Sequence, residues 1–146
     1  MQKELVICII IVIAIIVVNI FTHNNTKLAV AEMNESLENV STKILESEKD
    51  NKTEESKEGR KSTKENSAKD IEEEIENSKE IWNRKYQSLA YYIEHDELEK
   101  VSEALIKAKS NIKAEEYNTA IENINSCIFL LQHIEEKDKF TLKNIF

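Results

Sequence analysis

An apolar run near the amino terminus, Leu5–Phe21, constrains this chain most, because it contains no charged side chain. At a helical rise of about 1.5 Å per residue the run spans roughly 26 Å, slightly less than the hydrocarbon core of about 30 Å in a bilayer. Local thinning of the bilayer and polar flanking residues cover such a deficit at modest cost. The sequence therefore predicts one membrane-spanning helix within residues 1–27.

A cleaved signal peptide is the alternative reading of the same run. Its apolar region is usually about 7–15 residues long, and a small-x-small cleavage site follows closely. The nearest triplet of that kind, Ala29–Ala31, lies well beyond Phe21. The spacing therefore favours an uncleaved signal anchor. Lys3 precedes the run, whereas acidic residues soon dominate after it, which favours a cytoplasmic amino terminus. We expect a single-pass protein of the cytoplasmic membrane with an extracytoplasmic bulk.

The composition of the chain predicts an all-α fold. There is no proline, one glycine and 33% charged residues, and strands and tight turns normally need more glycine and proline than this. The net charge of −8 excludes nucleic acid as a partner bound through bulk electrostatic attraction. Cys8 lies in the apolar run and Cys127 far from it, so no disulfide is expected.

The residues after the anchor divide into three parts. Residues 28–45 carry apolar side chains in a 3,4 spacing, which is typical of a helix with a heptad seam: Val30, Met33, Leu37, Val40 and Ile44. This amphipathic helix either packs on the rest of the chain or forms a short dimerising, coiled-coil-like stalk. Residues 46–69 have almost no apolar side chains and are predicted to be a charged flexible linker.

Residues 70–146 show three stretches of helical periodicity and predict a three-helix antiparallel bundle. The first stripe includes Ile71, Ile75 and Trp82 and ends at His95. Asp96 and Glu99 match a capping box that would open the second helix. A turn around 114–116 precedes the third helix. A domain of this size has a marginal core, so we expect a homo-oligomer or a membrane-protein partner.

Two histidines provide the sharpest hypothesis about chemistry. His95 and His133 would lie at the same end of the bundle, each with carboxylates nearby, among them Glu99 and Glu136. Imidazole with carboxylate suits a transition metal or a proton sensor. The simpler interpretation is that both histidines and their acidic neighbours complement helix dipoles. No catalytic triad and no glycine-rich phosphate loop can be read, so we expect neither an enzyme nor a cofactor.

Four aromatic and apolar residues are candidates for contact with a partner. Tyr91 and Tyr92 are adjacent and must face different ways, and we take Tyr92 as the contact residue. An apolar carboxyl terminus either docks on its own bundle or is offered to a partner. The terminal candidates are Phe140, Ile145 and Phe146.

Several short signatures resemble domain-of-unknown-function family 4363. They are Trp82, the turn Ile93–Leu98, the segment Phe129–Ile134 and the closing Leu142–Phe146, and the region between the anchor and the last half aligns poorly. The resemblance implies a small, N-terminally anchored helical protein of spore-forming Gram-positive bacteria, and it implies no activity. We therefore expect a non-enzymatic interaction domain or accessory subunit, with a metal or pH sensor as the alternative.

Overall fold

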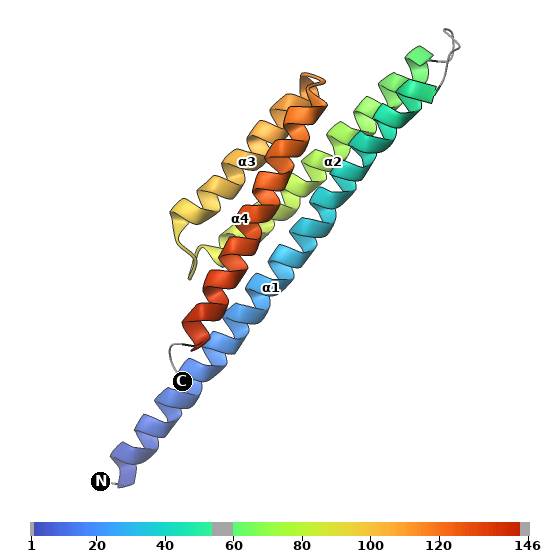
Figure 1. The fold of residues 1–146 in the computed structure, drawn as a ribbon. Coiled ribbons are helices and arrows are strands. Elements are labelled where there is room, and N and C mark those ends of the chain that lie inside the picture. Colours follow the sequence, from blue (N-terminus) through green and yellow to red (C-terminus); the bar gives the residue numbers. More distant parts are fainter. Residues whose placement is uncertain (1, 54–59, 144–146) are drawn as a thin grey trace.

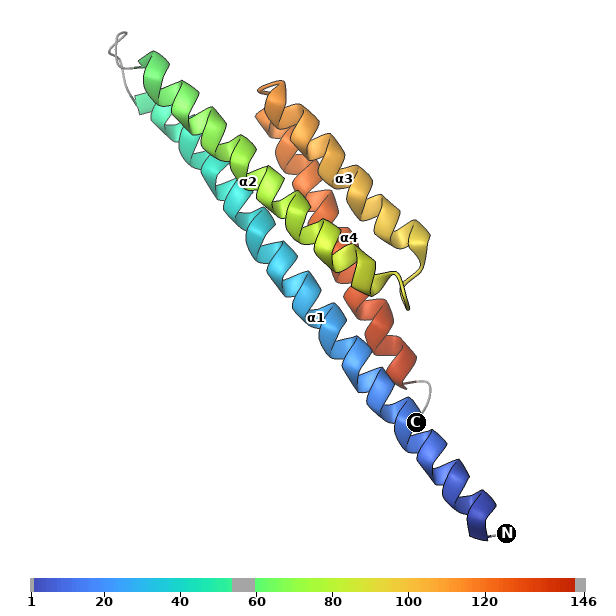
Figure 2. The ribbon, with the colours of Figure 1, turned by 180° about the vertical axis from the view of Figure 1, so that it is seen from behind.

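The computed structural model describes residues 2–53 and 60–143 of the chain. All of the secondary structure in these two ranges is helical, as the composition predicts. The four helices are α1 (Gln2–Thr53), α2 (Arg60–Leu89), α3 (His95–Lys113) and α4 (Tyr117–Lys143). Each helix runs in the opposite direction to the one before it, and the amino-terminal part of α1 projects beyond the other three (Figures 1 and 2).

Helix α1 joins the predicted membrane segment to the predicted amphipathic helix without a break. Its 52 residues extend for roughly 78 Å. The apolar side chains from Leu5 to Phe21 are mostly exposed, whereas the seam from Val30 to Ile44 is at most 1% exposed. No glycine or proline separates the two parts, so nothing in the local sequence ends the helix between them.

The seam of α1 is packed against helices of the same chain. Helix α1 contacts α2 and α4, and α3 contacts the same two helices, so among the described residues the contacts form a closed ring of four. Within the described residues, the Cα atoms of α2 and α4 do not come within 8 Å of each other, so these two helices lie across the ring from one another. The structure therefore differs from the predicted three-helix bundle, because α1 supplies the fourth side of one continuous core.

The predicted linker, residues 46–69, is helical over 46–53 and 60–69, which corrects that prediction. Residues 54–59, with the single glycine, lie outside the described residues. Lysine and glutamate have good helix propensities, and the flanking turns are held by the core. Ser47 is buried on α1, Ile71 is buried on α2, and Lys43 pairs with Glu74 between the two helices at 2.6 Å. The absence of apolar residues here indicates exposure to solvent, and an exposed segment can still be helical.

The core between α1 and α2 contains a buried polar pair as well as apolar side chains. The hydroxyls of Ser36 and Ser78 lie 2.6 Å apart, and both residues are buried. Ser78 also donates to the carbonyl of Glu74 at 3.0 Å, so Ser36 has an acceptor oxygen to which it can donate. Small hydrogen-bonded side chains allow the two helices to approach closely without leaving an unsatisfied hydroxyl.

The turn between α2 and α3 lies earlier than predicted. Helix α2 ends at Leu89 rather than at His95, and α3 begins at His95 with Glu94 in the N-cap position. Glu94 makes no side-chain capping hydrogen bond, and Asp96 lies inside the helix, so the predicted capping box is not formed. The turn is closed instead by backbone bonds from Tyr92 and Ile93 to the carbonyl of Leu89.

The turn between α3 and α4 lies where the sequence predicts it. The backbone N–H groups of Glu115 and Glu116 donate to the carbonyls of Ile112 and Asn111, at 3.0 and 2.8 Å. This pair of bonds is a Schellman motif, which satisfies carbonyls at the end of α3. Its left-handed position is held by Glu115, with φ of 57°. That conformation suits glycine better than a residue with a Cβ atom.

Glu115→Gly is expected to raise the free energy of unfolding by up to about 1 kcal/mol. The substitution removes the steric cost of the left-handed conformation, and the greater freedom of glycine in the unfolded chain offsets part of the gain. Urea unfolding of the full-length protein in detergent micelles, followed by circular dichroism, measures the change. Glu116→Gly is the control, and a gain at Glu116 as large as at Glu115 would contradict the assignment of the left-handed position.

Candidate functional site

The four residues of the predicted metal site are exposed and are not brought together. His95 begins α3, with its ring 6.5 Å from that of Tyr86, and His133 lies on α4. The described residues, which include Glu99 and Glu136, contain no group of three or more His, Cys, Asp or Glu side chains placed to hold a metal ion. His95 is the first residue of α3, whereas His133 lies ten residues before the end of α4, so the two histidines do not both stand at helix ends.

Of the four residues predicted to contact a partner, the structure describes the side chain of Tyr92 alone. The side chains of Phe140, Ile145 and Phe146 lie outside the described residues, so that prediction stays a prediction. Tyr92 is half-buried, and it is the neighbouring Tyr91 that is exposed, to 90%. The side chain of Tyr92 connects the α2–α3 turn to α1 of the same chain.

The hydroxyl of Tyr92 holds this turn against α1 just beyond the apolar run. It accepts a hydrogen bond from the side-chain amide of Asn25 at 2.8 Å and donates to the carbonyl of Thr22 at 3.3 Å. The hydroxyl of Thr26, which is fully buried, lies 3.3 Å away and bonds to the same carbonyl. Buried hydroxyls need partners of this kind, and here α1 and the turn supply them to each other.

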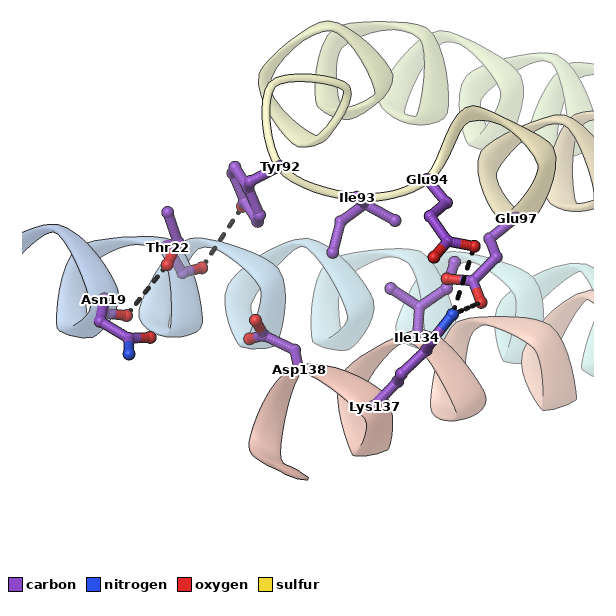
Figure 3. A pocket seen from close by; sticks show the side chains of 9 residues that line it. All are labelled: Asn19, Thr22, Tyr92, Ile93, Glu94, Glu97, Ile134, Lys137 and Asp138. Atoms are coloured by element: carbon purple, nitrogen blue, oxygen red, sulfur yellow. Dashed lines mark hydrogen bonds and ion pairs between the residues drawn. The ribbon is translucent and has the colours of Figure 1, made fainter. Parts of the chain in front are cut away.

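A cavity of about 240 Å³ lies beside this contact (Figure 3). Its walls come from the end of the apolar part of α1, from the α2–α3 turn, from the first turn of α3 and from the last turns of α4. The lining residues are Asn19, Thr22, Tyr92, Ile93, Glu94, Glu97, Ile134, Lys137 and Asp138.

Lys137 crosses from α4 to the start of α3. Its ammonium lies 2.6 Å from a carboxylate oxygen of Glu97 and 3.4 Å from one of Glu94 (Figure 3). The hydrogen bond to Glu97 is the main cause that raises the pKa of Lys137, so the side chain is a permanent cation at neutral pH. The group is solvated, so the pair contributes little to stability and chiefly places charge at the rim.

A second pair joins α1 to α4 at the other side of the cavity. Nδ1 of His23 lies 3.0 Å from Oδ2 of Asp138, and the two side chains are 22% and 11% exposed. Asp138 is thus the more buried of the two charged groups of α4 that line the cavity. It is held beside Asn19 and Thr22, where the apolar part of α1 ends.

Sequence reasoning missed His23, Asn25 and Asp138. A signal was present, because the heptad seam of α1 extends back from Val30 to Thr26 and His23 at the same 3,4 spacing. Polar residues on that stripe must face the same neighbours as the apolar seam does. A pattern of apolar side chains alone does not reveal this polar continuation of the seam.

Tyr92→Phe is expected to lower the free energy of unfolding by about 1–2 kcal/mol, because Asn25 loses its nearest acceptor while the ring still packs. Urea unfolding of the full-length protein in micelles measures it. Tyr91→Phe provides the matched control, since its ring is exposed, and should change stability by less than about 0.5 kcal/mol. Equal effects at the two tyrosines would contradict the assigned role of Tyr92.

Comparison with known proteins identifies the family and goes no further. A search of curated proteins and a search of solved structures each found no match. A family described as a domain of unknown function, DUF4363, matches residues 20–145. The match begins near the end of the apolar run and covers the seam of α1, every cavity-lining residue except Asn19, and all of α2 to α4. The chain belongs to this DUF4363 family.

Proposed function

We propose that this protein is a membrane-anchored, non-enzymatic helical domain that serves as an accessory or interaction subunit at the outer face of the cytoplasmic membrane. One observation carries the proposal, which is that α1 is a single helix with an exposed apolar half and a buried core half. By length and composition α1 is the one described helix able to cross a membrane. Because α1 is continuous, a change in the tilt of its apolar half also moves its half in the core.

The outer surface of α4 is the protein-binding face in this proposal. Phe129 is 68% exposed there and lies in a shallow hollow of about 520 Å³. The other lining residues are Glu122, Asn125, Ser126 and Leu130. An exposed phenylalanine bordered by polar side chains is typical of an interface anchor, because burial of the ring drives association and the polar border gives specificity.

Site-specific photo-crosslinking of the full-length protein in native membranes tests the interaction role. A photoreactive phenylalanine analogue at position 129 should give one discrete adduct, to be identified by mass spectrometry. The same analogue at Lys107, an exposed polar position of α3, should give none. No adduct at position 129, or the same adducts at both positions, would contradict a specific interface on α4.

Cysteine labelling tests the proposed sidedness. A cysteine placed at Lys107 should react with a membrane-impermeant maleimide in intact cells if the domain is extracytoplasmic. The native thiols give little background, because Cys8 lies in the apolar run and burial raises the pKa of the Cys127 thiol to about 12. Labelling that requires cell lysis would place the domain in the cytoplasm and reverse the orientation.

A further inference from the structure

An apolar groove of about 510 Å³ adjoins the cavity described above and extends along the apolar part of α1. Its apolar lining comes from the face of α1 that carries Ile11, Ala14, Ile15 and Val18. Asn19, Thr22 and Tyr92 line both this groove and the cavity. The cavity and the groove therefore share one wall, whose three residues are labelled in Figure 3. The cavity, on the side of α4, is polar, and the groove, on the side of the amino terminus, is apolar.

The boundary between groove and cavity lies at the level of the lipid headgroups in an anchored protein. The apolar run ends at Phe21. The hydrocarbon core is about 30 Å thick and the whole bilayer about 40–45 Å, which leaves roughly 5–8 Å for each headgroup layer. Residues 22–26 rise through about 7 Å at helical spacing, so Thr22 and the hydroxyl of Tyr92 fall within that layer.

The charges at the cavity favour a cationic group. Three carboxylates line it, from Glu94, Glu97 and Asp138, against the single ammonium of Lys137. Lys137 pairs with Glu94 and Glu97. Asp138 pairs with His23, which comes from α1. The carboxylates that line the cavity outnumber the lining ammonium, so these side chains carry a net negative charge. The volume is about eight times the ~30 Å³ share of one water molecule, so it admits a group larger than a single ion.

We propose that the cavity and groove together bind one phospholipid with an amine headgroup, of the phosphatidylethanolamine class. The ammonium of the lipid lies near Asp138 and the glutamates, Lys137 faces its phosphate, and one acyl chain lies along Ile11, Ala14, Ile15 and Val18. The inference rests on the membrane anchoring in the proposed function and adds a specific lipid to it. It is independent of the proposed protein-binding face on α4.

Native mass spectrometry of the full-length protein in detergent micelles, titrated with phosphatidylethanolamine or phosphatidylglycerol of identical acyl chains, tests the proposal. One phosphatidylethanolamine should be retained per chain, with phosphatidylglycerol bound roughly tenfold more weakly, as expected for loss of one charged contact. Asp138→Asn should remove most of that preference.

A matched pair of substitutions tests the groove without touching the folded domain. Ile15→Trp fills the groove and should reduce phosphatidylethanolamine retention roughly tenfold. Ile13→Trp places the same ring about 200° away around α1, where it does not line the groove, and should leave retention unchanged. Ile13 and Ile15 are equally exposed, at 55%, so the pair differs in direction alone.

Several outcomes would overturn the proposal. Equal retention of the two lipids, or equal effects of Ile13→Trp and Ile15→Trp, would mean that the protein has only general lipid contacts. A lipid-free dimer would assign the groove to a second copy, and retention that appears only after deletion of residues 144–146 would assign it to the chain's own end. Release of the protein from native membranes by alkaline carbonate would instead defeat the anchoring itself, so the two failures are distinguishable.

Discussion

Replacing Trp82 with alanine is expected to lower the free energy of unfolding by about 3–5 kcal/mol. The ring is 1% exposed in the core and meets the ring of Tyr86 edge to face, with centroids 6.0 Å apart. Its Nε1–H donates to the hydroxyl of Ser102 at 2.7 Å, which joins α2 to α3. The truncation thus removes a large buried surface and one of the bonds between these helices. Urea unfolding of the full-length protein in micelles, followed by circular dichroism at 222 nm, measures the loss.

Two further variants separate packing from hydrogen bonding at this position. Trp82→Phe keeps most of the apolar ring and loses the N–H donor, so it should cost less than the alanine variant. Ser102 still donates to the carbonyl of Leu98 at 3.0 Å, so its hydroxyl is not left unsatisfied. Tyr91→Ala, at an exposed ring, should change stability by less than about 0.5 kcal/mol. A loss at Trp82 no larger than at Tyr91 would contradict the described core.

Leu37→Ala is expected to lower the free energy of unfolding by about 2–5 kcal/mol, with a midpoint that does not depend on protein concentration. Leu37 is fully buried in the middle of the α1 seam, where α1 contacts α2 and α4 of the same chain. If the seam were instead a dimerising stalk, stability would rise with concentration, since association and folding would then be linked. Unfolding in micelles at protein concentrations a hundredfold apart distinguishes the two cases.

Leu28→Ala is the control for this prediction. Leu28 lies on the same helix, nine positions before Leu37, and is 67% exposed. Its truncation removes the same atoms from a surface position, so the expected change is within about 0.5 kcal/mol. A shift of the midpoint with concentration in the native protein, abolished in Leu37→Ala, would show that the seam joins two chains.

Helical periodicity predicted most of the core, because burial repeats with the turn of the helix. Ile71, Ile75, Trp82 and Leu89 are all buried as their spacing predicts. Periodicity was a poor guide to where α2 ends, since Leu89 and Ile93 fit the same stripe and the chain turns between them. Backbone hydrogen bonds close this turn, and they do not depend on which side chains are apolar, so the apolar pattern does not reveal them.

The candidate site was the least predictable part of the molecule. Asn19 and Asp138 are 119 positions apart in the sequence, and no spacing rule relates them. His23 and Asp138 become partners because α4 returns beside α1 after three reversals of the chain. His95 and His133 have acidic neighbours along the chain, but two of these, Glu99 and Glu136, are exposed, whereas Glu97 pairs with Lys137.

The sequence by itself determined the helical class, the apolar amino-terminal segment, the seam of α1 and the family, because each depends on the order of neighbouring residues and on helical periodicity. Tertiary structure alone decided that α1 continues unbroken from the apolar run into the core, and that residues 28–45 pack in the same chain. It also decided that a polar cavity adjoins an apolar groove where α1 leaves that run. These features depend on which helix faces pack together. The four apolar faces are buried jointly in one core, so the pattern of any one helix does not specify its neighbours.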